Sequence, residues 1–283
     1  VQFAKDVAEA TSNEIQITVH PNASLFKSPE IKRAVQTGQA EIGEIPIPLL
    51  ENENPIFGAS SLPFMVNDME DARKLLQASR AAAEEKLLEQ GLVLLYTVPW
   101  PAQGIFSDRA LNTVEDMRGL KWRSSLPIIA KIGNMVGAQP VTIQEADLPQ
   151  ALATGVVNAY LSSSMTGYNS KTWESLGYYY NVKAYVVSNM VFMNKAVFDG
   201  LSDDVKAAVM EAAAEAEKRG WEIAPERDAW YIEELRKNGM TVDDGSPELL
   251  AGLREVGAKL VDEWLDATGA EGQAIVDAYN ASR

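Results

Sequence analysis

The sequence predicts an α/β fold made of two lobes that share one long helix. Three observations support this fold class. Strands alternate with short helices between Gly119 and Ser164, the order helix–strand–helix–strand occurs twice along the chain, and a long helix with an apolar side follows Ser202. Alternating strands and helices are typical of βαβ units around a mainly parallel sheet. The chain has 283 residues, which is enough for two domains of ordinary size.

The central stretch from Gly119 to Ser164 organises the rest of the chain. It begins with a short strand at 120–124 that carries Arg123. The elements that follow are a helix at 128–135, an apolar strand at 140–143, a helix at 145–154 and a strand at 156–161 that leads into three serines at 162–164. Because ligands bind such sheets at the carboxyl ends of the strands, we expect Arg123 to lie at a ligand site.

An internal repeat relates the central stretch to the start of the chain. Residues 34–42 read AVQTGQAEI and residues 151–159 read ALATGVVNA, so each segment is a helix end, a Thr-Gly pair and a strand. A helix and a strand precede each segment, and in the second copy the strand with Arg123 comes before them. We therefore expect a duplication in which a first strand, together with a signal peptide, would precede Val1.

The helix after Ser202 is expected to serve both lobes. Its apolar side continues to Asn238, which corresponds to about 55 Å at 1.5 Å per residue and exceeds the size of one small domain. Pro225 lies inside this helix and predicts a kink. The predicted lobes are discontinuous, with lobe I at 1–99 and 189–225 and lobe II at 100–188 and 226–283. A ligand cleft between them would close by a hinge movement.

The remaining elements follow from apolar periodicity and from helix and turn signals. The predicted strands lie at 14–19, 40–47, 92–98, 105–107, 178–180, 184–193 and 240–242. The predicted helices lie at 3–11, 28–37, 68–88 (two helices that meet near residue 79), 172–174, 194–198 and 247–279.

The composition excludes several classes of function. The net charge of −15 disfavours nucleic acid and anionic membrane surfaces as partners. Cysteine is absent and His20 is the single histidine, so thiolate metal sites, cysteine nucleophiles and histidine triads are excluded. We expect neither a metal site nor a cofactor.

Six short motifs, spread in order over nearly the whole chain, carry a resemblance to a known family. They are Phe3-Ala4 with Val7, Glu30 and Ala34-Val35 with Gly38, 62–65 (LPFM), 116–123 (DMRGLKWR), 137–140 (GAQP) and 150–157 (QALATGVV). The chain resembles the substrate-binding proteins of tripartite ATP-independent periplasmic (TRAP) transporters. The resemblance implies a two-lobed periplasmic binding protein fold, a periplasmic location, capture of a small organic acid and delivery to the subunits of a TRAP membrane permease. We expect the protein to be a monomer.

The resemblance assigns the central role to Arg123. In the family, the arginine of Gly-Leu-Lys-x-Arg pairs with the ligand carboxylate, and the planar guanidinium suits a carboxylate because it offers two parallel hydrogen bonds. Gln103 stands where the sialic-acid-binding branch has a second pocket arginine. Ser162 replaces a pocket asparagine, and Glu145 replaces an aromatic residue. These departures argue against sialic acid as the ligand.

Other candidate ligand-binding residues follow from position alone. Trp100 could cover the carbon frame of a ligand or pack at the lobe junction. Ser162 and Ser163 suit a polyhydroxylated or 2-hydroxy acid. Phe64 is expected to approach the ligand from the first lobe, and Tyr160 either packs or touches the ligand. Glu145 either faces the ligand or caps its own helix, where a negative charge is favourable.

The sequence thus favours a receptor that closes on a sugar acid or a 2-hydroxy or 2-oxo acid without performing chemistry. The alternative is an enzyme that acts on a small carboxylate in the same cleft, with Glu145 as acid and base. The single histidine and the lack of a nucleophile–base pattern argue against the enzyme. A sensory or scaffolding role on the same fold is a third reading.

Overall fold

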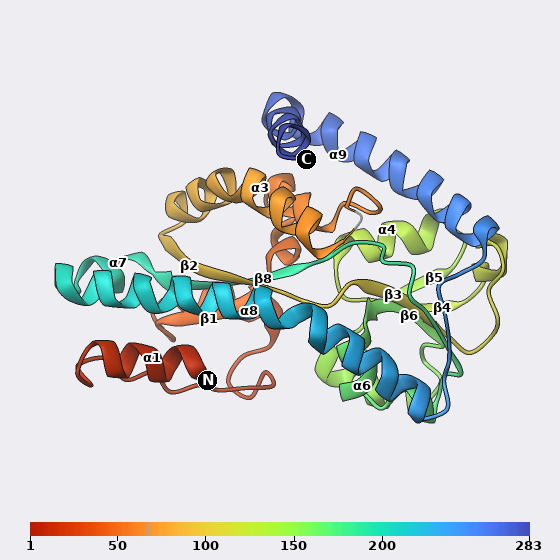
Figure 1. Cartoon of the computed structure of the whole chain (residues 1–283), viewed down its shortest axis with the longest axis horizontal. Coiled ribbons are helices and arrows are strands. Elements are labelled where there is room, and N and C mark those ends of the chain that lie inside the picture. Colours follow the sequence, from red (N-terminus) through yellow and green to blue (C-terminus); the bar gives the residue numbers. More distant parts are fainter. Residues whose placement is uncertain (67) are drawn as a thin grey trace. The chain divides into compact units, whose positions relative to one another are not determined.

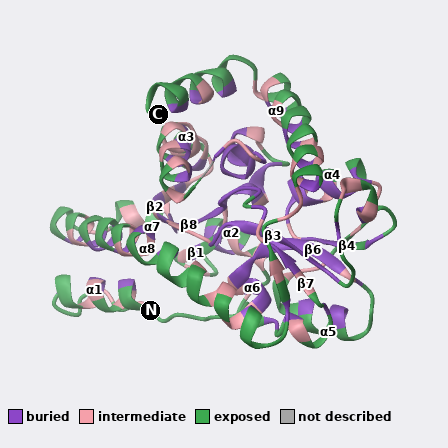
Figure 2. Ribbon diagram, turned by 45° about the vertical axis from the view of Figure 1, so that its right-hand side comes forward, coloured by how far each residue is buried: buried purple, intermediate pink, exposed green. Residues whose placement is uncertain are grey.

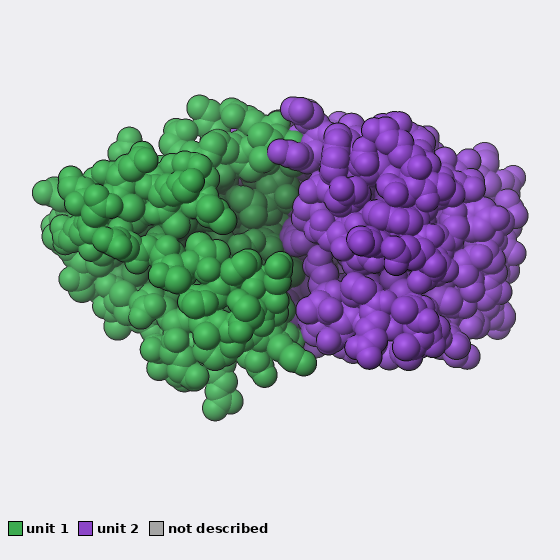
Figure 3. Space-filling view, turned by 90° about the horizontal axis from the view of Figure 1, so that it is seen from below, with its two compact units in different colours: residues 1–46, 80–99, 188–224 green, residues 47–79, 100–187, 225–283 purple. Residues whose placement is uncertain are grey.

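The computed structural model describes residues 1–66 and 68–283. They form two compact units, which Figure 1 draws as ribbons and Figure 3 colours separately. Unit 1 comprises residues 1–46, 80–99 and 188–224, and unit 2 comprises residues 47–79, 100–187 and 225–283. Within the described residues, no helix combines the length and the apolar character that a membrane crossing requires.

The two units differ from the predicted lobes in one segment. Residues 47–79 belong to unit 2, although the sequence suggested lobe I. The C-terminal helix explains the difference, because Trp264 Nε1 donates to the Pro55 carbonyl at 2.6 Å and the Tyr279 hydroxyl donates to the Met65 carbonyl at 3.1 Å. The other boundaries agree to within one residue.

Unit 1 is built on a three-stranded antiparallel sheet of order β1-β8-β2. The strands are β1 (Ile42–Pro46), β2 (Leu92–Pro99) and β8 (Ser188–Asn194), and the helices are α1 (Gln2–Ala10), α2 (Ser28–Gln36), α7 (Lys195–Asp199), the second part of α3 (Met69–Glu89) and the first part of α8 (Asp203–Lys237). Apolar residues of α1, β2, β8 and α8 form one buried cluster.

Two predictions of secondary structure are wrong, one in unit 1 and one for the helix that crosses the boundary between the units. Residues 14–19 alternate like a strand, but they pair with no strand among the described residues; instead Ile15 and Ile17 pack on the apolar cluster. A strand needs a partner for its backbone hydrogen bonds, so the alternation of apolar and polar residues does not by itself establish a strand. The two helices expected at 68–88 are the single helix α3, although the boundary between the units does fall at Ser79.

The long helix α8 confirms the prediction of one extended helix after Ser202. It has 35 residues and contains Pro225, which removes one backbone donor from the helix interior. Residues 203–224 belong to unit 1 and residues 225–237 to unit 2.

Unit 2 is built on a six-stranded mixed sheet of order β5-β4-β6-β3-β7-β9. The strands are β3 (Gln103–Ser107), β4 (Lys121–Ser124), β5 (Gln139–Thr142), β6 (Ala159–Ser163), β7 (Tyr178–Tyr180) and β9 (Thr241–Asp243). Strand β4 pairs in parallel with β5 and β6, and β3 is antiparallel to β6 and β7. Figure 2 shows β3 and β6 as buried.

Helices cover both faces of this sheet. The α-helices of unit 2, besides parts of α3 and α8, are α4 (Pro127–Met135), α5 (Leu148–Ala153), α6 (Ser164–Asn169) and α9 (Pro247–Ala281), and the short 3₁₀ helices are η1 (Ile47–Leu50), η2 (Pro55–Ser61), η3 (Val114–Met117), η4 (Glu145–Asp147) and η5 (Thr172–Glu174). One apolar cluster joins the sheet to α4 and α9, and a second joins it to α5 and the end of α8. Gly269 interrupts α9 with non-helical backbone angles.

Candidate functional site

Arg123 lies where several strands of unit 2 end at one edge of the sheet. The parallel strands β4, β5 and β6 end there, and the antiparallel strand β3 begins there. In the register, Arg123 is opposite Val141 on one side and Tyr160 on the other, and Gln103 is opposite Ser163. The predicted position of Arg123 at a carboxyl end of a strand is therefore confirmed.

The Arg123 side chain is a buried cation. The residue is 2% exposed, and its Nε donates to the Ile143 carbonyl at 2.9 Å. Among the described residues, Arg123 forms no ion pair, and its terminal nitrogens donate to no protein group. Burial lowers the pKa of the guanidinium, and Glu145, Tyr160 and Tyr185 act in the opposite direction. A buried charge without a partner is costly, so this site favours an anion.

Glu145 lies next to this cation in η4. Burial raises the pKa of its carboxyl, and the positive charge of Arg123 acts in the opposite direction. The residue as a whole remains accessible to solvent. Its carboxylate accepts no hydrogen bond from the described residues, and the N-cap position of η4 is Gln144. Glu145 is therefore not the N-cap itself, but it places a negative charge in the first turn of η4, as expected.

Two buried polar residues that the sequence did not reveal are Tyr185, which interacts electrostatically with Arg123, and Glu51, which interacts electrostatically with Tyr185. Tyr185 is 1% exposed, and its hydroxyl has no hydrogen-bond partner among the described residues. Burial and the charge of Glu51 raise the pKa of this hydroxyl, whereas Arg123 acts to lower it. Glu51 is itself buried, and its Oε1 accepts from Lys131 Nζ at 2.9 Å.

The segment that carries Tyr185 is not part of the strand predicted at 184–193, since β8 begins at Ser188. Single backbone hydrogen bonds hold it beside the start of β3. Ala184 N donates to Gln103 O at 2.8 Å, and Gln103 N donates to Tyr185 O at 2.9 Å. Trp100 N donates to Val187 O at 2.8 Å. These bonds fix Trp100, Gln103 and Tyr185 relative to one another.

The side chains of Gln103 and Trp100 both interact with other residues of unit 2. Gln103 is 4% exposed, and its Nε2 donates to the Pro101 carbonyl at 2.9 Å, which turns the amide toward its own backbone. Trp100 is half-buried and packs against the apolar cluster that joins the sheet to α4 and α9. Packing of Trp100 within unit 2 is thus observed, and its contact with a ligand stays a prediction.

The three serines at the end of β6 have different roles. Ser162 lies two residues after Tyr160, so it shares the sheet face of Arg123, and its hydroxyl bonds to no described residue. The Ser163 hydroxyl accepts from Thr166 N at 3.1 Å and caps α6. The Ser164 hydroxyl donates to Asp228 Oδ1 at 2.6 Å. Of the three serines, Ser162 is therefore best placed to contact a ligand that binds to Arg123.

Tyr160 is a core residue. Its ring stacks on Phe106 with a centroid distance of 4.5 Å, and its hydroxyl lies 2.6 Å from Thr172 Oγ1. Burial raises the pKa of this hydroxyl.

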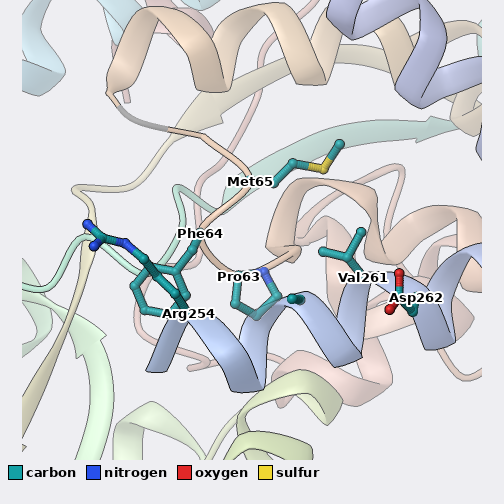
Figure 4. A pocket seen from close by; sticks show the side chains of 7 residues that line it. Pro63, Phe64, Met65, Arg254, Val261 and Asp262 are labelled. Carbon is teal, nitrogen blue, oxygen red and sulfur yellow. The ribbon is translucent and has the colours of Figure 1, made fainter. Parts of the chain in front are cut away.

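Phe64 lies on a turn in unit 2, not in the first lobe as expected. Its backbone has a left-handed φ of 58°, and its N donates to Ala184 O at 2.6 Å. Figure 4 shows its ring beside a surface pocket that Arg254 and Asp262 of α9 also line. Arg123 is not among the residues that line this pocket.

The chain matches a family and several characterised proteins over nearly its full length. The model of the bacterial extracellular solute-binding protein family 7 (DctP) matches residues 1–267. DctP6 of Bordetella pertussis, an extracytoplasmic solute receptor described as binding pyroglutamic acid, is 48% identical with a TM-score of 0.97, covering 99% of this chain and 93% of that chain. A TRAP solute-binding protein from a marine metagenome, described as specific for pyroglutamate, is 44% identical with a TM-score of 0.97, covering 99% and 92%.

A more distant curated relative is the C4-dicarboxylate-binding periplasmic protein DctP of Rhodobacter capsulatus. The two sequences are 27% identical over an alignment of 293 residues. The alignment covers 99% of this chain and 85% of that protein. The predicted two-lobed α/β fold and the predicted resemblance are both confirmed by these matches. The chain therefore belongs to family 7 of the bacterial extracellular solute-binding proteins, which are the substrate-binding proteins of TRAP transporters.

Proposed function

We propose that this protein is a periplasmic receptor that captures one small organic acid through Arg123 and delivers it to a TRAP membrane permease. One observation carries the proposal: Arg123 is 2% exposed and has no carboxylate partner among the described residues. A ligand carboxylate would supply the missing negative charge and accept two parallel hydrogen bonds. Ser162, on the same face of the sheet, would add a hydroxyl to the ligand contacts.

The acid that we propose is pyroglutamate, rather than the sugar acids or 2-hydroxy and 2-oxo acids that the sequence suggested. Two proteins that are 48% and 44% identical to this chain are described as pyroglutamate binders. Pyroglutamate carries one carboxylate on a compact ring, which suits a site with one buried arginine and with Gln103 at the position of a second one. The relative that is named as binding C4-dicarboxylates is only 27% identical to this chain. It therefore gives weaker support for a dicarboxylate as the ligand.

Capture would proceed by closure of two lobes, without chemistry, in a monomeric protein. We propose that Trp100 and Phe64 contact the carbon skeleton of the ligand. The competing function is an enzyme, and the raised pKa of Glu145 beside Arg123 is the observation that favours it. A receptor releases its ligand unchanged, so ligand recovered after denaturation of the loaded protein should be intact; a converted product would favour the enzyme.

Titration calorimetry of the wild-type protein and of Arg123→Ala with L-pyroglutamate tests the proposal. Loss of a buried charge pair should weaken binding by at least ~2 kcal/mol, or roughly 30-fold. Equal affinity of the two proteins would refute the role of Arg123. If neither protein binds pyroglutamate, a thermal-shift screen of organic acids follows, because ligand at 100 times its Kd adds ~2.7 kcal/mol of stability.

A further inference from the structure

Glu51 presents a buried acceptor without a donor. One carboxylate oxygen, Oε1, accepts from Lys131 Nζ at 2.9 Å. The other, Oε2, is buried and has no hydrogen-bond partner among the described residues. Gly58 allows this placement, because a Cβ atom there would lie 3.1 Å from Glu51 Cγ and 3.4 Å from Oε2. The carboxylate is thus held by an ion pair and by close packing, with one oxygen left for another donor.

Tyr185 presents a buried hydroxyl that is equally unpaired. The residue is 1% exposed, and its hydroxyl bonds to no described residue. Its backbone is fixed by the hydrogen bond from Gln103 N, and the charges of Glu51 and Arg123 both act on the hydroxyl. Buried polar groups in folded proteins are nearly always hydrogen-bonded, so an unpaired hydroxyl that interacts with both an unpaired carboxylate oxygen and a buried cation is unusual.

The three groups together match one kind of ligand edge. Arg123 offers donors to a carboxylate, Glu51 Oε2 can only accept when ionised, and a tyrosine hydroxyl can donate. A lactam acid carries a carboxylate, a ring N–H donor and a ring C=O acceptor along one side of a small ring. We propose that Glu51 and Tyr185 recognise the amide of a lactam acid: Glu51 Oε2 accepts from the ring N–H, and the Tyr185 hydroxyl donates to the ring carbonyl, while Arg123 binds the carboxylate. The assignment rests on the proposed receptor function.

This arrangement predicts which close analogues the protein rejects. The lactone 5-oxotetrahydrofuran-2-carboxylate keeps the carboxylate, the carbonyl and the ring size, but it places a ring oxygen where the lactam has its N–H. That oxygen would face Glu51 Oε2, so two acceptors would oppose each other. Open-chain glutamate would bring a second carboxylate toward Glu51. A site that is built to bond an N–H rejects analogues that lack it, because its own polar group is then left unpaired.

The first test needs no variant. Calorimetric titration of the wild-type protein with L-pyroglutamate, the lactone and L-glutamate should give an affinity for the lactam at least ~10-fold higher than for either analogue. A lactone that binds as tightly as the lactam would overturn the role of Glu51. Binding of other carboxylates through Arg123, with no binding of the lactam, would overturn the lactam assignment and leave the receptor function standing. Binding of no acid at all would overturn both.

Two variants then test the residues one at a time. Glu51→Gln should weaken pyroglutamate binding ~10-fold and bring the lactam-to-lactone ratio close to one, because its amide can donate to the lactone ring oxygen. Glu174→Gln, an exposed residue of η5, is the charge-matched control. Tyr185→Phe should weaken binding of both ring compounds by a similar factor, since both keep the carbonyl.

Tyr179→Phe is the control for Tyr185→Phe. The Tyr179 hydroxyl is also buried and unpaired, but Asp228 and Tyr160, rather than Arg123, are the main groups that act on it. Thermal melting of each variant shows that it is folded. An unchanged lactam-to-lactone ratio in folded Glu51→Gln, or equal effects of Tyr185→Phe and Tyr179→Phe on affinity, would overturn the assignment of that residue.

Discussion

Lys131 Nζ lies 2.9 Å from Glu51 Oε1 and joins two segments that are 80 residues apart in the sequence. Lys131 is on α4, the helix that directly follows the strand bearing Arg123, and Glu51 follows η1. The Lys131 side chain is 46% exposed, whereas that of Glu51 is 8% exposed. The lysine therefore forms an ion pair with a buried carboxylate while its own charge remains partly hydrated.

Lys131→Met is expected to destabilise unit 2 through Glu51. The variant leaves a buried carboxylate without its cation, and because the lysine is half-exposed we expect a loss of about 1–2 kcal/mol rather than the larger values of fully buried pairs. Urea denaturation with and without Glu51→Gln measures the effect. The double variant should lose less than the sum of the two single variants. Strictly additive losses would mean that the ion pair makes no contribution.

Arg123→Lys is expected to weaken ligand binding although the charge is conserved. Lysine cannot offer two parallel donors to a carboxylate, and it cannot keep the hydrogen bond from Nε to the Ile143 carbonyl. We expect a loss of affinity of about 10-fold or more, measured by calorimetry. Arg118→Lys, on the exposed turn before β4, is the control and should leave the affinity unchanged. Full affinity in Arg123→Lys would show that only the charge matters.

The position of Arg123 at the carboxyl end of a strand could be predicted because its signal is local. A short strand, the Gly-Leu-Lys-x-Arg motif and the alternation with helices all lie within a few tens of residues of each other. Residues 47–79 were misassigned for the opposite reason. Their partner is α9, and the hydrogen bond from Trp264 to Pro55 spans 209 residues. Apolar periodicity does not report contacts over such distances.

Glu51 and Tyr185 escaped prediction because neither is in a regular element with a motif. Glu51 lies in a turn after a 3₁₀ helix, and Tyr185 lies in the irregular segment before β8. Both residues are far from Arg123 in the sequence, so no local pattern connects them with it. The roles of Ser162 and Ser163 also needed the structure, because only the register shows which hydroxyl shares the face of Arg123 and which one caps α6.

The pH dependence of ligand binding is expected to reflect protonation of the Glu145 carboxyl. Burial raises the pKa of its carboxyl above the ordinary value of 4.5, despite the opposing effect of Arg123. As the pH falls from neutral through this raised pKa, the carboxyl becomes neutral and stops repelling a ligand carboxylate. The affinity should therefore rise on mild acidification, until the carboxyl of the ligand is protonated at roughly pH 3.3–3.7.

Glu145→Gln should remove this dependence. At neutral pH the variant should bind the acid more tightly than the wild type, by less than ~10-fold because the residue as a whole is exposed to solvent. It should also be more stable at neutral pH, since a carboxyl whose folded pKa is raised favours folding only when it is protonated. The advantage in stability should shrink as the pH falls below the raised pKa. Parallel pH profiles of the two proteins would contradict the assignment.

Gly104→Ala is expected to disturb the start of β3 and with it the site. Gly104 is opposite Ser162 in the register, and a Cβ atom at this position would lie 2.5 Å from Tyr179 Cε2 and 2.6 Å from the Tyr180 carbonyl oxygen. Neither atom can move easily, because the Tyr179 ring is buried in the core and the Tyr180 carbonyl belongs to the backbone of β7. Overpacking of this kind costs about 1–3 kcal/mol.

Gly177→Ala is the matched control for that substitution. It lies directly before β7, and a Cβ atom there would meet no atom within 4 Å. Urea denaturation should therefore show a clear loss of stability for Gly104→Ala and a change within about 0.5 kcal/mol for Gly177→Ala. Because Gln103 and the backbone bonds to Tyr185 adjoin Gly104, the first variant should also bind pyroglutamate more weakly under conditions where it is fully folded. Equal stabilities of the two variants would show that β3 can shift at no cost, in which case its start would not be a rigid element that positions Gln103 and Tyr185.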